Sequence, residues 1–286
     1  MKKTKVITYV RVCTDKQASK RNSLSNQEEI LKKYCDNKNY NVVKHYKDVC
    51  SGLDFDRQEW NNLMDFVKNN KEPYNYLEPF AGAAATFWSL NNLSGTNTLN
   101  EFDPELTNFY EQVKKQDKTF LQLVHDASEL YKDKSSDAHD IQEAMYYSWR
   151  NKDRNNGLAK LSKAERAARF FIVNQLAFSG MRRFNGSGDF NVPYGHYKNL
   201  NSDVLTSPAH IKLLKNTTIT TGDYAPAIKN NDTENTFIFL DPPYTRVMKK
   251  YSADNEFGDA QQYELADTLK NLTSAKWMMV IDKSEL

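Results

Sequence analysis

The fold is decided by the stretch Phe237-Ile238-Phe239-Leu240-Asp241-Pro242-Pro243-Tyr244. Its four apolar residues are typical of a buried parallel strand, and the two prolines end that strand because they cannot donate to its hydrogen-bond ladder. In open α/β sheets, ligands bind at the carboxyl ends of the strands. The stretch therefore brings a carboxylate, a rigid carbonyl and an aromatic ring to the mouth of a pocket. That combination suits holding an exocyclic amine and stacking on a purine.

The composition fits a cytoplasmic protein of one or two domains. The chain has 286 residues, 39% of them hydrophobic, and its net charge of +2 does not by itself indicate a nucleic-acid partner. The three cysteines, Cys13, Cys35 and Cys50, lack metal-ligand spacing, and so sparse a set is typical of a reducing compartment. No apolar run reaches membrane-spanning length. We therefore expect a soluble, cytoplasmic protein with no metal site and no membrane span.

Strands and helices alternate in the first block of the sequence. The patterns predict strands at 5–12 and 40–46 and helices at 25–34 and 58–69. Ser25, with Glu28 three residues later, is expected to cap the first helix. This order indicates an α/β unit, and a polar break that includes Pro73 ends it. We predict one domain at 1–72 and a second at 73–286.

The second block has the pattern of a parallel sheet interrupted by helices. Strands are predicted at 74–80, 219–221, 237–240 and 277–281, and a helix at 261–272. Helical patterns dominate from 102 to 176, and residues 180–201 are rich in glycine, asparagine and aromatic residues. A loop of that length is usually functional. The fold class expected is α/β, a mostly parallel sheet with helices on both faces and an insertion at about 104–215.

Three further segments of the second block bear on ligand binding. Residues 78–83, Glu-Pro-Phe-Ala-Gly-Ala, are a strand-to-helix turn of small residues that lets a ligand approach the backbone. Glu101 stands about twenty residues later, where nucleotide-binding units often carry an acid for the ribose hydroxyls. Gly222-Asp223-Tyr224 follows another strand. Each segment alone is common among ordinary turns and exposed acids, but chance is a poor explanation for all of them in this order with 241–244.

With these segments, residues from about Tyr76 to Leu286 resemble the Dam-like adenine-specific DNA methyltransferases, which use S-adenosylmethionine. The resemblance includes Arg169-Phe170-Phe171-Ile172-Val173-Asn174 and the loop segments 178–185 and 188–197. It implies a methyltransferase-like parallel sheet, a helical insertion that recognises double-stranded DNA, and methyl transfer to the N6 amino group of adenine. GATC is the default target site, because some members of the family read it.

The resemblance also implies residue roles. Phe80 and Gly82 would border the methyl donor, Glu101 would hold its ribose, and Asp223 and Tyr224 would border its adenine. The target adenine would be held by Asp241, Pro242, Pro243 and Tyr244. The DNA would be read by Met181, Arg183, Asn185 and Pro193. Arg183 could take either a guanine edge or a phosphate, and the sequence does not choose between them.

The proposed chemistry follows from the weak nucleophilicity of the adenine amine, whose lone pair is delocalised into the ring. Accepting its two N–H protons on the Asp241 carboxylate and the Pro242 carbonyl would return electron density to the nitrogen and aim it at the sulfonium methyl. This is positioning with electrostatic stabilisation and needs no covalent intermediate. Tyr244 would stack on the base after it has left the duplex.

The sequence departs from the family in three places. The family's Trp-Ala-Gly-Gly-Lys segment does not precede Tyr76, Ala83-Ala84 stand where glycines are usual, and the family's additional strand pair does not follow Leu286. We therefore expect a crowded or incomplete donor pocket.

The first block resembles the opening of the serine recombinases (resolvases and invertases). The segment that carries the resemblance is Tyr9-Val10-Arg11-Val12-Cys13-Thr14-Asp15-Lys16-Gln17, with further matches at Gln27, Asp48, Ser51-Gly52 and Arg57. Cys13 stands where that family has its nucleophilic serine, and a thiolate is the softer nucleophile, poorer at phosphorus. In that family, clustered arginines stabilise the charge that develops when the serine attacks DNA phosphate. Of this arginine set, only Arg11 and Arg57 are present in this sequence.

Three hypotheses follow for the function. The first is an adenine-specific DNA methyltransferase preceded by a partial recombinase domain. The second is a DNA-binding fusion in which neither half turns over, and the third is a serine recombinase with an accessory domain. The complete 241–244 run and the recognition loop favour the first.

Overall fold

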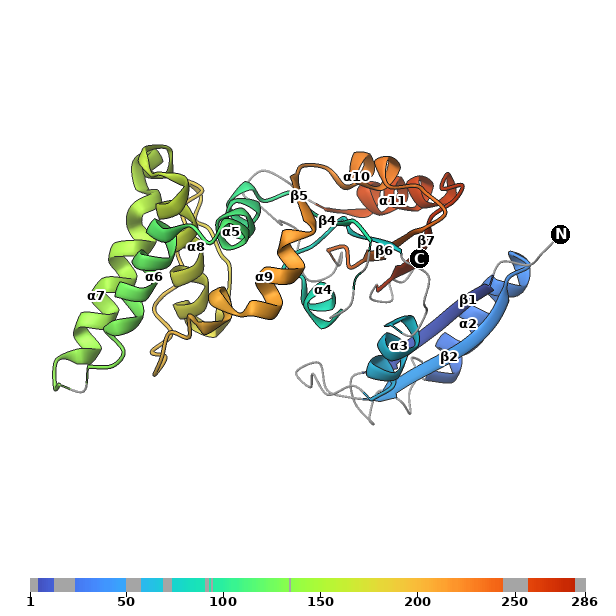
Figure 1. The fold of residues 1–286 in the computed structure, drawn as a ribbon, viewed down its shortest axis with the longest axis horizontal. Coiled ribbons are helices and arrows are strands. Elements are labelled where there is room, and N and C mark those ends of the chain that lie inside the picture. The colour runs from blue at the N-terminus through green and yellow to red at the C-terminus, as the bar shows by residue number, and fades with distance from the viewer. Residues whose placement is uncertain are drawn as a thin grey trace. The chain divides into compact units, whose positions relative to one another are not determined.

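The computed structural model describes residues 5–12, 24–49, 58–68, 74–90, 93, 95–133, 135–243 and 257–280. The chain divides into two compact units, Met1–Glu72 and Pro73–Leu286 (Figure 1). No helix among the described residues is long and apolar enough to cross a lipid bilayer.

The second unit is built on a five-stranded sheet. Its strands are β3 (Asn75–Glu78), β4 (Asn97–Glu101), β5 (Thr217–Thr221), β6 (Thr236–Leu240) and β7 (Lys276–Met279). They lie in the order β5-β4-β3-β6-β7, and all neighbours are parallel. The expected α/β architecture is therefore confirmed. Strand β4 is missing from the sequence prediction because its sequence, Asn-Thr-Leu-Asn-Glu, is polar, yet every one of its residues is buried.

Helices cover both faces of this sheet. They are α4 (Ala85–Ser89), α10 (Tyr224–Asn230) and α11 (Asp259–Lys270). Successive side chains of a strand point to opposite faces. Tyr76 of β3 accordingly stacks on Phe87 of α4, whereas Leu77 packs in a buried cluster with Ile228 of α10 and Leu265 of α11. Figure 1 shows α10 and α11 together on one side of the sheet and α4 on the other.

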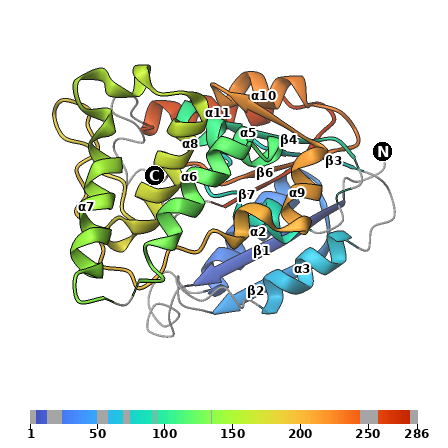
Figure 2. The same cartoon turned by 60° about the vertical axis from the view of Figure 1, so that its left-hand side comes forward.

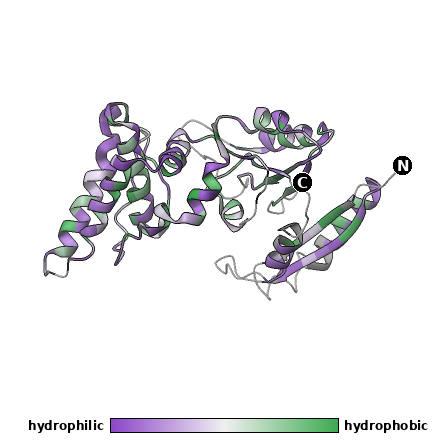
Figure 3. Cartoon of the chain, in the orientation of Figure 1, coloured by the Kyte–Doolittle hydropathy of each residue, from purple (hydrophilic) through white to green (hydrophobic). Residues whose placement is uncertain are grey.

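A helical region is inserted in the chain between β4 and β5, which are neighbours in the sheet. It contains α5 (Pro104–Lys115), α6 (Lys118–Glu129), α7 (Ala138–Arg150), the 3-10 segment η1 (Asn151–Lys160), α8 (Lys163–Leu176), two short 3-10 turns, η2 (Phe178–Gly180) and η3 (Asp203–Thr206), and α9 (Pro208–Lys215). Helix α8 is central, since α5, α6 and α7 all pack on it (Figure 2). A capping box at Ser162 and Glu165 begins α8. The outer helix α7 carries both hydrophilic and hydrophobic residues (Figure 3), as an amphipathic helix does.

The first unit contains a parallel strand pair with two helices. Its elements are β1 (Lys5–Val12), α2 (Leu24–Asn37), β2 (Asn41–Val49) and α3 (Gln58–Lys68). The expected cap at Ser25 is wrong, because α2 begins at Leu24 and Ser25 lies inside it. Ser23 precedes Leu24 in the sequence and has the same capping chemistry, so residue type alone could not choose between the two serines.

Candidate functional site

The carboxyl ends of three neighbouring strands meet at the centre of the second unit's sheet. From β3 the chain passes to β4 on one side, and β6 later joins β3 on the other side. Such a reversal of strand order opens a crevice where ligands of α/β proteins bind. Residues predicted from sequence lie at all three ends: Phe80 after β3, Glu101 at the end of β4, and Asp241 after β6.

A cavity of about 210 Å³ lies at this crevice. Its lining includes Glu78, Phe80, Gly82, Ala84, Phe239 and Asp241. The structure therefore brings the turn at 80–84 and the carboxylate of Asp241 to one cavity, although they are far apart in the sequence.

The Glu101 side chain is fixed by backbone donors. One carboxylate oxygen accepts the Gly82 N–H at 2.8 Å, and the other accepts the Phe102 N–H at 2.9 Å. Only 2% of the residue is exposed, and this burial raises the pKa of its carboxyl group. The Asp103 N–H also donates to it, at 3.3 Å. Because a carboxylate offers about four acceptor sites, Glu101 can hold the turn after β3 and still has one acceptor site for a ligand.

The turn after β3 has left-handed backbone at two positions. Gly82 has φ 48° and Ala84 has φ 51°. Glycine adopts this conformation freely, whereas an L-residue such as Ala84 does so at a cost of roughly 1–2 kcal/mol. Ala84 is buried and lines the cavity, and Ala83 is exposed. Ala83 and Ala84, the two alanines where glycines were expected, both border the cavity, but only Ala84 has left-handed backbone.

An aromatic cluster borders the turn. The Phe80 ring lies 4.9 Å from the Tyr224 ring and 5.6 Å from Phe257, between ring centroids. Tyr224 is buried, and burial raises the pKa of its hydroxyl group. Asp223 is exposed and caps α10 by accepting the Ala225 N–H at 2.7 Å.

Asp241 is exposed at the end of β6, whereas Pro242 and Pro243 are buried. The Pro243 carbonyl accepts a hydrogen bond of 3.0 Å from the Gln262 side chain of α11, which fixes the chain as it leaves the strand. Tyr244 lies outside the described residues. Asp241 therefore stands exposed at the cavity, and the two prolines that follow it are buried.

Glu78 is a site residue that the sequence did not identify as one. It is 2% exposed, its carboxylate accepts hydrogen bonds from the Tyr76 hydroxyl and, at 2.8 Å, from the Phe87 N–H, and it lines the cavity. Burial, the largest cause, and the negative charge of Asp241 together raise its pKa to about 8, against the opposing effect of these hydrogen bonds. The signal in the sequence was weak, because an acid at the end of a strand is more often exposed.

Glu78→Gln is expected to flatten the dependence of stability on pH. The folded-state pKa of about 8 lies above the ordinary 4.5, so between these values the folded protein holds a proton that the unfolded chain releases. The contribution to stability is fully present below pH 4.5 and is lost as the pH rises to about 8, by at most about 1.4 kcal/mol per pH unit. Melting temperatures of both proteins from about pH 5 to about pH 9 would test this. Parallel pH profiles would contradict it.

The segment predicted to read DNA contains a small hairpin. Phe184 and Phe190 form an antiparallel bridge, with the Arg183 carbonyl accepting the Asn191 N–H at 3.0 Å. The Arg183 guanidinium donates to the Asn191 side chain at 2.8 Å. Asn185 shapes the tip, since its side-chain oxygen accepts the Asp189 N–H at 2.9 Å.

The other two residues predicted to read DNA lie on either side of this hairpin. Met181 is 40% exposed, and Pro193 is exposed while its carbonyl accepts the Phe178 N–H at 2.9 Å. All four of these residues, Met181, Arg183, Asn185 and Pro193, are therefore exposed and lie within the segment 181–193, which Phe190 and Val192 anchor by their burial.

A buried ion-pair network anchors this hairpin to the helices. Asp153 accepts bonds from Arg169 at 2.6 Å, from Arg154 at 2.7 Å and from the Phe190 N–H at 2.8 Å. Arg154 also donates to the Phe190 carbonyl at 2.8 Å. Asp153 and Arg169 have side-chain exposures of 7% and 10%. Sequence analysis missed Asp153, because it lies in a polar stretch that resembles an ordinary loop.

In the first unit, the residues that resemble a recombinase are only partly described. Arg11 lies opposite Asp48 in the strand register, and Cys13, Gln17 and Arg57 fall outside the described residues. Tyr9 donates its hydroxyl to Asp48 at 2.9 Å, and Asp48 also accepts the Trp60 N–H at 3.0 Å. Asp48 is buried, and because it accepts this N–H of the first turn, it caps the start of α3.

Comparison with known proteins identifies the family of the chain. Residues 57–286 match the model of the D12 class N6 adenine-specific DNA methyltransferases. The chain belongs to this family. Residues 6–73 also match the N-terminal domain of resolvases. Both resemblances expected from the sequence are therefore confirmed, and the two matches overlap at 57–73.

Curated relatives of this D12-class protein carry consistent names. It is 30% identical over 213 residues to the type II methyltransferase M.CviBI of Paramecium bursaria Chlorella virus NC1A, covering 73% of this chain and 74% of that protein. It is 29% identical over 222 residues to the type II methyltransferase M1.LlaDCHI of Lactococcus lactis subsp. cremoris, covering 74% and 73%. The DNA adenine methylase of Haemophilus influenzae is 29% identical over 211 residues, covering 72% and 68%.

Proposed function

We propose that the chain transfers the methyl group of S-adenosylmethionine to the N6 amino group of adenine in double-stranded DNA. One observation carries this proposal: Asp241, the residue suited to hold the amine, lines the same cavity as the turn at 80–84 that would border the donor. Membership of the D12 class supports a methyl donor and a DNA substrate.

The cavity suits the methyl donor in its charge. S-adenosylmethionine supplies an electrophilic methyl group on a sulfonium cation, and the exposed Asp241 carboxylate borders the cavity. Glu101, held by three backbone N–H groups, would use its remaining acceptor site for a ribose hydroxyl. Phe80, Asp223 and Tyr224 would border the adenine of the donor, with Phe80 and Tyr224 already packed together.

Asp241 and Pro242 would act on the target base. The carboxylate and the carbonyl would accept the two N–H protons of the adenine amine, which raises electron density on N6 and orients it. Pro243 would hold this geometry through its bond to Gln262, and Tyr244 would stack on the flipped base. After transfer, the Asp241 carboxylate can accept the proton that the methylated amine releases.

The insertion at about 104–215 would recognise the DNA through Met181, Arg183, Asn185 and Pro193. Support comes from the exposure of these residues on one anchored segment. Asn185 shapes the turn through its side-chain oxygen, so it would contact DNA with the remainder of its amide. We place the domain boundary at 72/73, so that 1–72 is the resolvase-like domain and 73–286 the methyltransferase domain.

The function is tested by incubating the chain with labelled S-adenosylmethionine and duplexes with or without GATC, followed by digestion and identification of the methylated base. We expect N6-methyladenine. Donor binding without transfer to any duplex would favour an inactive DNA-binding fusion, and absence of donor binding would overturn the proposal. Cleavage of supercoiled DNA that depends on Cys13 would instead favour the recombinase.

Glu101→Gln is expected to weaken donor binding by about 10- to 100-fold, because a hydrogen bond to a charged acceptor is worth about 1.5–3 kcal/mol. Titration calorimetry with S-adenosylmethionine would measure this. Melting temperatures must accompany it, since Glu101 also accepts the Gly82 N–H. Glu129→Gln, on the exposed face of α6, is the matched control. Equal donor affinity in a folded Glu101→Gln protein would remove Glu101 from the donor site.

A further inference from the structure

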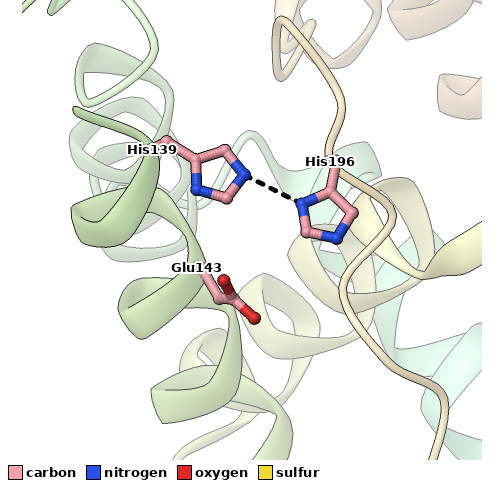
Figure 4. Close-up of side chains that lie close together, drawn as sticks. All are labelled: His139, Glu143 and His196. Atoms are coloured by element: carbon pink, nitrogen blue, oxygen red, sulfur yellow. Dashed lines mark hydrogen bonds between the residues drawn. The ribbon is translucent and has the colours of Figure 1, made fainter. Parts of the chain in front are cut away.

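Two histidines and a glutamate converge on the surface of the helical region. His139 and Glu143 lie one turn apart on α7, and His196 lies on the segment that follows Tyr194 (Figure 4). Nε2 of His139 lies 2.9 Å from Nδ1 of His196. One ligand atom from each of the three residues falls within 4.8 Å of the other two.

We propose that His139, Glu143 and His196 bind a single Zn²⁺ ion. Two imidazole nitrogens and one carboxylate oxygen suit a zinc ion that keeps a water molecule as its fourth ligand. Tetrahedral bonds of about 2.0–2.1 Å place two ligand atoms roughly 3.4 Å apart. To bind the ion, the two nitrogens, now 2.9 Å apart in a hydrogen bond, would separate by about half an ångström and both rings would turn toward the metal. The Glu143 carboxylate would move closer to them, from a position in which the three ligand atoms lie within 4.8 Å of one another.

The surroundings of the two histidines support this role. The Gly195 N–H donates to the Leu176 carbonyl at 2.8 Å, which fixes the backbone immediately before His196. A carboxylate oxygen of the exposed Asp140 lies 3.6 Å from Nδ1 of His139, the nitrogen opposite the proposed ligand atom. At that distance Asp140 makes no direct hydrogen bond to the ring, but its negative charge favours a cation bound nearby.

The proposed ion would join two parts of the insertion. Helix α7 supplies His139 and Glu143, while His196 follows closely after the exposed segment 181–193. Zinc would therefore clamp the end of that segment to α7. The sequence prediction of no metal site relied on cysteine spacing, and the two histidines are 57 residues apart, so only the fold brings them together.

The test is calorimetric titration of the full chain and four variants with ZnCl₂, with MgCl₂ as the control ion. The variants are His139→Ala, Glu143→Gln, His196→Asn and His125→Ala. Asparagine is used at 196 because His196 has φ 54°, a left-handed conformation that asparagine tolerates. His125 is the matched control, since it pairs with Glu129 at the same helical spacing on α6 and is not part of the three-residue group found among the described residues.

The parent and His125→Ala should bind one Zn²⁺ with equal affinity and ignore Mg²⁺. Each of the other three variants should lose about tenfold or more in affinity while keeping its far-ultraviolet circular dichroism. Substituting Co²⁺ should give visible absorption without the near-ultraviolet band of a thiolate ligand. Equal zinc affinity in all five proteins, a thiolate band or no zinc binding by the parent would each overturn the proposal. None of these readouts depends on methyl transfer.

Discussion

Asp241→Ala is expected to lower the rate of methyl transfer by about 10²–10³-fold or more, the effect of removing one electrostatic partner of a transition state. The variant loses the carboxylate that would accept an N–H of the target amine. Because Asp241 is exposed at the end of β6, and does not belong to the buried cluster beneath, the fold should survive. Single-turnover transfer to a duplex, measured together with donor affinity, would check this.

Two further variants sharpen the test at Asp241. Asp241→Asn keeps one acceptor oxygen but replaces the other with an amide donor, so its rate should lie between those of the parent and the alanine variant. Asp267→Ala changes an exposed aspartate of α11 that pairs with Lys270, and its rate should match the parent. If Asp241→Ala transferred methyl at the parental rate, the proposed role of this carboxylate would be lost.

Asp153→Ala is expected to destabilise the second unit by about 3–5 kcal/mol, the typical cost of breaking a buried ion pair from one side. The variant removes the carboxylate that pairs with the buried Arg169 guanidinium. It also leaves the Phe190 N–H without this hydrogen-bond acceptor, so the hairpin loses its anchor. Urea unfolding would measure the stability, and duplex binding should weaken as well because the loop that carries Arg183 is no longer held.

A double-mutant cycle separates this pairing from simple loss of packing. Asp153→Leu and Arg169→Met each remove one charge, and the double variant removes both charges of the most buried pair, while Arg154 keeps Asp189 at 3.6 Å. The double variant should therefore cost clearly less than the sum of the two single variants. Additive costs would show that the two charges are not coupled. Asp126→Ala, an exposed change on α6, provides the baseline.

The local sequence pattern predicted much of the sheet. The apolar runs before Asp241 and around Leu77 predicted β6 and β3, and both occur within two residues of the expected bounds. Strand β4 was not predicted, because its polar side chains find partners only in the folded sheet. Its Asn100 donates to the carbonyls of Pro79 at 3.1 Å and Gly222 at 3.0 Å, two contacts that no local pattern contains.

The candidate site, like the sheet, could be predicted from the sequence only in part. The sequence predicted Phe80 and Asp241 as separate pieces, since each lies after a strand that local patterning could locate. It predicted Glu101 only from its distance of about twenty residues from the turn at 78–83, because β4 itself was not predicted. It could not show that Glu101 holds the turn at Gly82, or that Glu78 is buried beside the cavity with a pKa raised to about 8. Both facts depend on which strands become neighbours.

The sequence by itself determined the parallel α/β class and the methyltransferase family, because strand periodicity and short motifs are local properties of the chain, and the same motifs predict the role of Asp241. The tertiary structure decided the anchor at Asp153, the cap at Asp48, and the cluster of His139, Glu143 and His196. Each of these three features includes a contact between residues that lie 11 or more positions apart in the chain. These contacts form only when the helices and strands pack together, so they cannot be predicted from composition or from the spacing of motifs.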